Sequence, residues 1–327
     1  LLATRSILAL LLSTVCVYYV WPPRPFLDDP GGFWRHRACD LPTAKADFPA
    51  YARANCSIVS TSRDVDLAVA IPLVARQQEA LLASLQTWSQ KKPSPLQATR
   101  FDVILFVSTT QGQLSPSIEH QIGKAATAAG AHSFQSTACA LSHKQDKYPL
   151  GTWVQFLLIL EQMHNARYTA FLLCEPDVRV LRAGWMDALQ STLATRERWW
   201  MRGSAWLHNT HLDDRTAHVN GNALYRADDA RFLKFVWLVL GAGITIRIPT
   251  DSPLGFDHTL RLALEGLCDC AAHRWLLDRF VYSSLIINLS LGPCMNDSEI
   301  NEAFPSAHLA HYNPQRCDTH AVKYHTS

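Results

Sequence analysis

The stretch Tyr168-Thr-Ala-Phe-Leu-Leu-Cys-Glu-Pro-Asp177 is an apolar run that stops abruptly at two carboxylates, Glu175 and Asp177. A continuous apolar run is typical of a buried parallel strand. In open α/β sheets, ligands bind beyond the carboxyl ends of such strands. Two acids at a strand tip suit a divalent cation, and a hard cation there can clamp a diphosphate. The stretch therefore suggests a nucleotide-sugar site, although acidic residues also follow strands as ordinary turn formers.

Strands and helices alternate upstream of this stretch. Short apolar runs predict strands at 66–72 and 101–107. Apolar residues at helical spacing predict helices over 76–88 and 152–164, and a further helix is expected over 116–129. This alternation predicts an α/β fold with a mostly parallel central sheet and helices on both of its faces.

The mixed pattern continues downstream. The apolar segment 232–248 is too short and too broken to span a membrane. We interpret it as a buried helix followed by a strand, because Gly241 and Gly243 interrupt it. The other expected elements are helices at 184–190, 257–265 and 273–280 and a strand at 199–203.

Composition is that of a globular protein. The 327 residues are 48% hydrophobic and 18% charged, which allows one large α/β domain or two smaller ones. The formal net charge is only +2, so there is no strong basic field. We therefore expect no nucleic-acid partner.

The N-terminal segment differs from the rest of the chain. Residues 6–23 carry no charge, and aromatic residues cluster near the end of the segment. We interpret 1–23 as a signal anchor, that is, a transmembrane helix, and the Pro- and Gly-rich region 24–63 as a stem. The catalytic domain would then span 64–327. A cleaved secretory signal is the alternative, but no small-residue cleavage site follows the apolar run.

Sequons and cysteines agree with a luminal or extracellular location. Asn-x-Ser sequons begin at Asn55, Asn288 and Asn296. Eight of the nine cysteines lie outside the apolar segment, an even number that is compatible with disulfides in an oxidising compartment. Connectivity cannot be read from the sequence. Two local pairs are plausible, Cys39 with Cys56 and Cys294 with Cys317.

Several motifs together resemble a known family. In chain order they are Tyr148-Pro-Leu-Gly-Thr152, Glu175-Pro-Asp-Val-Arg-Val-Leu-Arg-Ala-Gly-Trp185, Trp200-Met-Arg-Gly-Ser204 and His218-Val-Asn-Gly-Asn-Ala-Leu-Tyr225. Their order resembles that of a Golgi-type glycosyltransferase with the GT-A fold, within the nucleotide-diphospho-sugar transferase superfamily. The resemblance covers roughly residues 64 to 325, and no subfamily is identified.

The resemblance implies a metal site. Glu175-Pro176-Asp177 matches the family's Asp-x-Asp motif, with Glu in the first position. Asp177 would do most of the binding of Mn²⁺ or Mg²⁺, whereas Glu175 would reach a ribose hydroxyl or a metal-bound water. The family also tends to supply a late histidine. The C-terminal stretch offers His308, His311, His320 and His325. His320 and His325 are closest to the usual position, and Lys323 is a candidate for the diphosphate.

Other site residues follow from the resemblance and from the chemistry. Ile71 and Pro72 end the first strand, where the base and ribose usually bind. If the reaction inverts the anomeric carbon, a carboxylate must deprotonate the acceptor hydroxyl. Asp257 is the first candidate and Asp251 the second, each also explicable as an acid at a helix start or turn. If the reaction retains the anomeric configuration, no such base is needed and Asp257 would have another role.

Residues 218–225 are the other expected site element. Asn220, Gly221 and Asn222 permit a tight or left-handed backbone that brings amides close to a ligand, and Asn side chains suit sugar hydroxyls. A plain turn between strands is the alternative. Arg202 could contact the donor or the acceptor, or be an ordinary strand residue. Trp199, Trp200 and Trp206 could stack on a sugar but are more often core residues.

The sequence thus predicts a glycosyltransferase that moves a sugar from a nucleotide-diphosphate donor to a luminal glycan or glycoprotein acceptor. The expected location is the Golgi membrane, in a single-pass type II arrangement, with ER residence or secretion as alternatives. Two rival interpretations stay open. One is a catalytically inactive, GT-A-like sugar-binding protein, suggested by Glu175. The other is a membrane-anchored interaction domain stabilised by disulfides.

Overall fold

The computed structural model of the chain describes residues 58, 65–94, 99–143, 146–147, 150–195, 198–206, 218–246, 255–257, 260–261, 264, 275–276, 278–289 and 295–311. The proposed membrane helix at 1–23 and nearly all of the stem lie outside these residues. None of the helices in the described ranges combines the length and the hydropathy that a bilayer span requires.

The main sheet is mixed and mostly parallel, as expected. Its seven strands lie in the order β3-β2-β1-β4-β7-β6-β8. Strand β7 is antiparallel to both neighbours, β4 and β6, whereas the other neighbouring pairs are parallel. In chain order the strands are β1 (Leu67–Leu73), β2 (Phe101–Ser108), β3 (Ser133–Cys139), β4 (Ala170–Leu173), β6 (Met201–Trp206), β7 (His218–Arg226) and β8 (Phe280–Tyr282).

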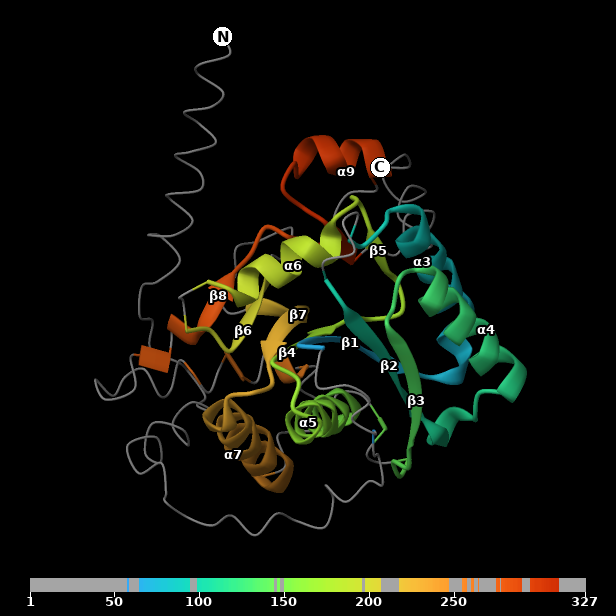
Figure 1. Cartoon of the computed structure of the whole chain (residues 1–327). Helices are drawn as coiled ribbons and strands as arrows, with labels where there is room; N and C mark the ends of the chain where they lie inside the picture. The colour runs from blue at the N-terminus through green and yellow to red at the C-terminus, as the bar shows by residue number, and fades with distance from the viewer. Residues whose placement is uncertain are drawn as a thin grey trace, which may run out of the picture.

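Helices cover both faces of this sheet, which confirms the sequence prediction (Figure 1). One face packs against α5 (Leu150–Asn165) and α7 (Ala230–Ile246), which Figure 1 shows side by side. The other face packs against α3, α4 and α6. These three helices are α3 (Gln78–Gln90), α4 (Pro116–Ala128) and α6 (Trp185–Leu193), and short 3₁₀ turns lie at η2 (Ala75–Gln77) and η3 (Thr109–Gln111).

Strand β1 shows why the sequence reads as an unbroken apolar run. Ala68 and Ala70 enter the core under α5 and α7, whereas Leu67, Val69 and Ile71 enter the core under α3 and α4. All five are fully buried. A strand that is buried on both faces needs apolar residues at every position rather than at alternate ones.

The topology creates a switch point between β1 and β4. The chain proceeds outward from β1 to β2 and β3, and then returns to the other side of β1 as β4. The carboxyl ends of β1 and β4 are therefore neighbours, while their connections leave in opposite directions. Ligands of open α/β sheets bind at such a point. The acid pair Glu175 and Asp177 follows β4 directly.

A second, smaller sheet continues from this point. Its order is β5-β10-β9, with β10 antiparallel to β5 and parallel to β9. Only Cys174 to Asp177 separate β4 from β5, so the acid pair joins the two sheets. The elements are β5 (Val178–Val180), β9 (Ile286–Asn288), α9 (Asp297–Ala303) and β10 (Leu309–His311).

Three sequence predictions were wrong in detail. Helix α7 runs through Gly241 and Gly243 to Ile246, so no strand begins within the described part of that segment. A glycine costs a helix only about 1 kcal/mol, which the packing of α7 outweighs. The expected helix at 273–280 is 3₁₀ at its described positions and gives way to β8 at Phe280. Residues 218–225 form strand β7, so they have neither the tight or left-handed backbone that the sequence suggested nor the plain turn that was its alternative.

Cysteine usage also departs from the expected even set. Cys174 is a free thiol that lies buried at the end of β4. The eight cysteines outside the apolar segment therefore cannot all form disulfides with one another. The two plausible pairs, Cys39 with Cys56 and Cys294 with Cys317, lie outside the described residues, and both stay predictions.

Candidate functional site

The acid pair sits on a tight turn at the switch point. The amide nitrogen of Val178 donates to the carbonyl oxygen of Glu175 at 3.1 Å, which closes the turn Glu175-Pro176-Asp177-Val178. Proline in the second position pre-sets the backbone for such a turn. The side chains of Glu175 and Asp177 are 48% and 30% exposed, so both carboxylates reach solvent.

His311 completes a cluster with the two acids. It ends β10 and pairs in register with Val178 on β5, immediately after the turn. Its Nε2 atom lies 2.8 Å from Oε2 of Glu175 and 3.2 Å from Oδ1 of Asp177. One ligand atom from each of the three residues lies within 4.8 Å of the others, so the group could hold a metal ion.

The cluster concentrates negative charge around a buried imidazole. Burial lowers the pKa of His311, but the neighbouring carboxylates of Glu175 and Asp177 outweigh burial and raise the pKa to about 10. Burial, followed by the charges of Asp177 and Glu175, raises the pKa of the Cys174 thiol well above its usual range. The two carboxylates suit Mn²⁺ or Mg²⁺, whereas the imidazole is a ligand typical of transition-metal ions, and a divalent cation would replace the proton on His311.

Strand β7 holds the turn from the side of the main sheet. The backbone nitrogen of Glu175 donates to Oδ1 of Asn222 at 2.7 Å, and Asn222 is only 2% exposed. The backbone nitrogen of Gly221 donates to Oδ2 of Asp257 at 2.9 Å. Asp257 is therefore linked through the backbone of β7 to the residue that anchors Glu175.

Gly221 has a different role from the one that the sequence suggests. It lies within extended β7, and it is not one of the described residues with a positive φ angle. A Cβ atom there would lie 3.1 Å from the ring of Phe256. That ring stacks on Phe156 with centroids 4.1 Å apart, so it has little room to yield. Close packing, rather than a left-handed backbone, explains the glycine.

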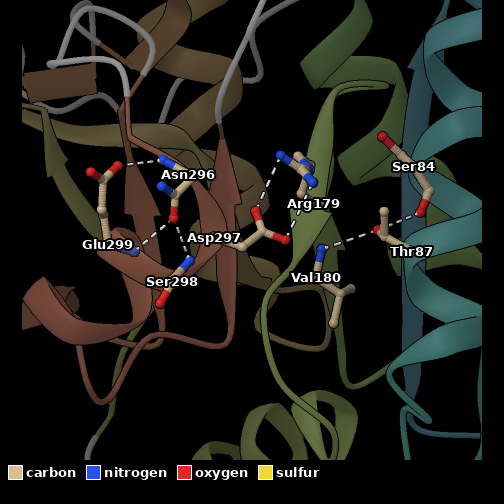
Figure 2. Close-up of polar contacts among 8 residues, drawn as sticks. All are labelled: Ser84, Thr87, Arg179, Val180, Asn296, Asp297, Ser298 and Glu299. Atoms are coloured by element: carbon tan, nitrogen blue, oxygen red, sulfur yellow. Dashed lines mark hydrogen bonds and ion pairs between the residues drawn. The ribbon is translucent and has the colours of Figure 1, made fainter.

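Helix α3 holds the same turn from the opposite side. The hydroxyl of Ser84 donates to the carbonyl oxygen of Pro176 at 2.7 Å, in a buried position. One turn later, Trp88 Nε1 donates to the carbonyl of Val178 at 3.3 Å, and Val180 donates its backbone nitrogen to Oγ1 of Thr87 at 3.4 Å. Figure 2 shows the contacts that run from Val180 to Thr87 and from Thr87 to Ser84. These residues lie at helical spacing, the only signal in the sequence that could have indicated a shared face.

The other predicted site residues are distributed as follows. Ile71 is buried in the core, and the adjacent Pro72 is half-buried at the carboxyl edge of the sheet. Arg202 lies half-buried on β6, and Trp199 and Trp200 are core residues. The residues Asp251, His320, His325 and Lys323, together with the side chains of Trp206 and Asn220, lie outside the described part of the chain.

His311 was one of four C-terminal histidines noted in the sequence, but not a favoured one. A usable signal is present in hindsight: Leu309-Ala-His311 is a short apolar run that ends in a potential ligand, as Ala170 to Glu175 does. His311 reaches the acid pair because β10 pairs with β5, and these two strands are far apart in the chain.

No protein-family model and no curated protein matches the chain. Several solved structures similar to it are glycosyltransferases, the class that the sequence resembles. A galactosyltransferase, LgtC, with donor and acceptor sugar analogues shares 10% identity over 80% of this chain and 97% of its own, with a TM-score of 0.48. The bifunctional glycosyltransferase WbbM shares 7% over 78% of this chain and 47% of its own, with a TM-score of 0.48. Mouse xyloside xylosyltransferase 1 shares 9% over 77% and 99%, with a TM-score of 0.45. At this level of sequence identity and TM-score, the likeness does not assign a function, and the subfamily stays open.

Proposed function

We propose that the protein is a metal-dependent glycosyltransferase that moves a sugar from a nucleotide-diphosphate donor to a glycan or glycoprotein acceptor. The observation that carries the proposal is the convergence of Glu175, Asp177 and His311 at the switch point of a mostly parallel sheet. Such a point is where α/β proteins bind ligands. Carboxylates with an imidazole are suited to a divalent cation that binds phosphate oxygens.

Each residue of the cluster and of its surroundings has a distinct proposed role. Asp177 and His311 would hold Mn²⁺ or Mg²⁺, and Glu175 would bind the same ion or a water on it. When bound, the cation would act as a Lewis acid that neutralises the charge growing on the leaving diphosphate. Ser84 and Asn222 fix the turn on both sides, so the carboxylates need no reorganisation during the reaction.

The carboxylate of Asp257 already makes a contact within the protein. Its Oδ2 atom accepts a hydrogen bond from the backbone nitrogen of Gly221 at 2.9 Å. This contact supports a positioning role for Asp257 next to the turn. A role as the general base of an inverting reaction stays a proposal, as does the same role for Asp251.

Glutamate in the first acid position does not by itself favour an inactive protein. The longer side chain of Glu175 still brings Oε2 to 2.8 Å from His311, closer than Oδ1 of Asp177 at 3.2 Å. The geometry of the cluster therefore supports metal binding with Glu in this position, and it favours an enzyme over a binding protein that has lost its metal.

The proposed location is the Golgi membrane in a single-pass type II arrangement, with the catalytic domain in the lumen. The uncharged segment at 6–23 and the sequons support it. Protease protection of a C-terminal epitope in intact microsomes tests the arrangement, because a luminal C-terminus resists protease until detergent is added.

Metal-dependent donor binding tests the activity. The purified protein is titrated with a panel of UDP- and GDP-sugars, with and without Mn²⁺, while heat or melting temperature is followed. We expect at least one donor to bind only with Mn²⁺. Asp177→Asn should abolish that response, because it removes a carboxylate from the metal cluster. Asp228→Asn is the control, since this exposed acid follows β7 at the opposite edge of the sheet. If no donor responds to metal, the enzyme proposal is wrong.

A further inference from the structure

The asparagines of two of the three Asn-x-Ser sequons, Asn288 and Asn296, are among the described residues, and their side chains differ in burial. N-glycosylation attaches a glycan to Nδ2 of the asparagine, which must therefore face solvent in the folded protein. Asn296 is exposed and directly precedes α9, whereas Asn288 is the last residue of β9, an edge strand of the small sheet. Asn55 lies outside the described residues.

Within the described part of the chain, the side-chain contacts of Asn296 use its oxygen and not its nitrogen. Its Oδ1 atom accepts from the backbone nitrogens of Ser298 at 2.9 Å and Glu299 at 3.1 Å. Glu299 in turn accepts from the backbone nitrogen of Asn296 at 2.8 Å, which completes a capping box (Figure 2). A glycan on Nδ2 would leave the amide oxygen in place, so modification and helix capping are compatible.

The surroundings of Asn296 also favour a glycan. Figure 1 shows α9 at the outer margin of the molecule, away from the main sheet. The next residue, Asp297, is paired with Arg179 of β5 at 3.2 Å, which holds the start of the helix on the small sheet. The sequon thus starts a helix that is held on the small sheet, and both Asn296 and Ser298 are exposed to solvent.

Asn288 is in the opposite situation. Its Nδ2 atom is buried, with less than 1 Å² exposed. It pairs in register with His311, and the backbone nitrogen of the next residue, Leu289, donates to the carbonyl of His311 at 2.9 Å. A glycan on Asn288 would require Nδ2 to leave this buried position beside β10, the strand that ends in His311. The burial of Nδ2 therefore disfavours a glycan on Asn288 in the folded protein.

We propose that Asn296 is an N-glycosylation site and that Asn288, despite its intact sequon, is not modified in the folded protein. The reaction replaces one N–H bond of Nδ2 with a bond to the anomeric carbon of an oligosaccharide. The cell's transferase supplies this oligosaccharide on a lipid diphosphate, and the lipid diphosphate and the amide proton leave. The inference requires entry into the secretory pathway but is independent of the transferase activity proposed above.

The test uses the full chain with a C-terminal epitope, expressed in mammalian cells in an Asn55→Gln background. Mobility is compared before and after peptide-N-glycosidase F. We expect one enzyme-sensitive step, which Asn296→Gln and Ser298→Ala each remove. Ser298→Ala is the decisive variant because Ser298 reaches Asn296 through its backbone nitrogen, so the helix cap survives while the sequon is lost.

Asn288→Gln and Ser290→Ala should leave the step unchanged in the soluble, folded fraction. The inference is overturned if the parent shows no sensitive step, or if the step survives both changes at Asn296 and Ser298. It is also overturned if changes at Asn288 remove the step.

Discussion

Replacing Ser84 with alanine should weaken metal binding although the side chain never touches the metal cluster. Ser84 is 5% exposed, and its hydroxyl donates to the carbonyl of Pro176, the residue between the two acids. The backbone hydrogen bond of the turn uses the Glu175 carbonyl, so the Pro176 carbonyl depends on Ser84. Removing the hydroxyl leaves this buried acceptor without its donor and frees the peptide group that orients Asp177.

The expected magnitude follows from that lost contact. A buried acceptor left unsatisfied costs about 1–3 kcal/mol, and each 1.4 kcal/mol is about tenfold in affinity. Part of this cost is relieved when the peptide rotates, and the rotation moves Asp177 away from His311. Loss of a partner that orients a metal ligand typically weakens binding about 10- to 100-fold. We therefore expect the Kd of Ser84→Ala for Mn²⁺ to rise about 10- to 100-fold.

Electron paramagnetic resonance of free Mn²⁺ measures this Kd directly on the purified protein. Thr192→Val is the matched control, because it removes another buried helix hydroxyl, which donates to the Leu189 carbonyl of α6. The control should lose stability without a change in Mn²⁺ affinity. The reasoning fails if Ser84→Ala binds Mn²⁺ as tightly as the parent, or if Thr192→Val weakens binding equally.

Three further predictions follow from other contacts. The neighbouring acids raise the pKa of buried His311 to about 10, so Mn²⁺ binding near neutral pH should release about one proton. The apparent Mn²⁺ affinity should therefore rise with pH until about 10. Calorimetry in two buffers of different ionisation enthalpy measures the proton release, and a pH-independent affinity would contradict the prediction. Burial raises the pKa of Asp229, but hydrogen bonds from Arg231 and Trp200 lower it from 3.8 to about 2. The pKa of Asp229 is lower in the folded than in the unfolded protein, so its contribution to folding stability is present above pH 3.8 and is lost as the pH falls toward 2. The urea midpoints of the parent and of Asp229→Asn should therefore converge between pH 3.8 and 2. A constant gap between the two midpoints would refute the assignment. Gly221→Ala should destabilise the protein by about 1–3 kcal/mol, because its Cβ would lie 3.1 Å from Phe256, and an unchanged urea midpoint would show that the ring yields.

The architecture could be predicted because its signals are local. Strands such as β1 and β2 are buried on both faces, so each reads as a continuous apolar run. Helices α3 and α4 carry apolar residues at helical spacing, and α4 also has Pro116 in its first turn. The acid pair after β4 was visible for the same reason, since it ends a run that is otherwise uniformly apolar.

The rest of the site could not be predicted because it depends on contacts between distant segments. Asn222 meets Glu175 only because β7 pairs antiparallel with β4, and Asp257 meets Gly221 across a sequence separation of 36 residues. His311 belongs to a three-residue strand, too short to stand out by periodicity. Gly221 was misread because tight packing and a left-handed backbone favour the same residue type.

Locating the metal tests the central claim most directly. Crystals of the protein grown with Mn²⁺ and UDP are measured at wavelengths on both sides of the manganese absorption edge. The proposal predicts an anomalous peak among Asp177, Glu175 and His311, in contact with the diphosphate. Bound UDP with no manganese peak at these three residues, or a peak elsewhere that contacts its diphosphate, would contradict it.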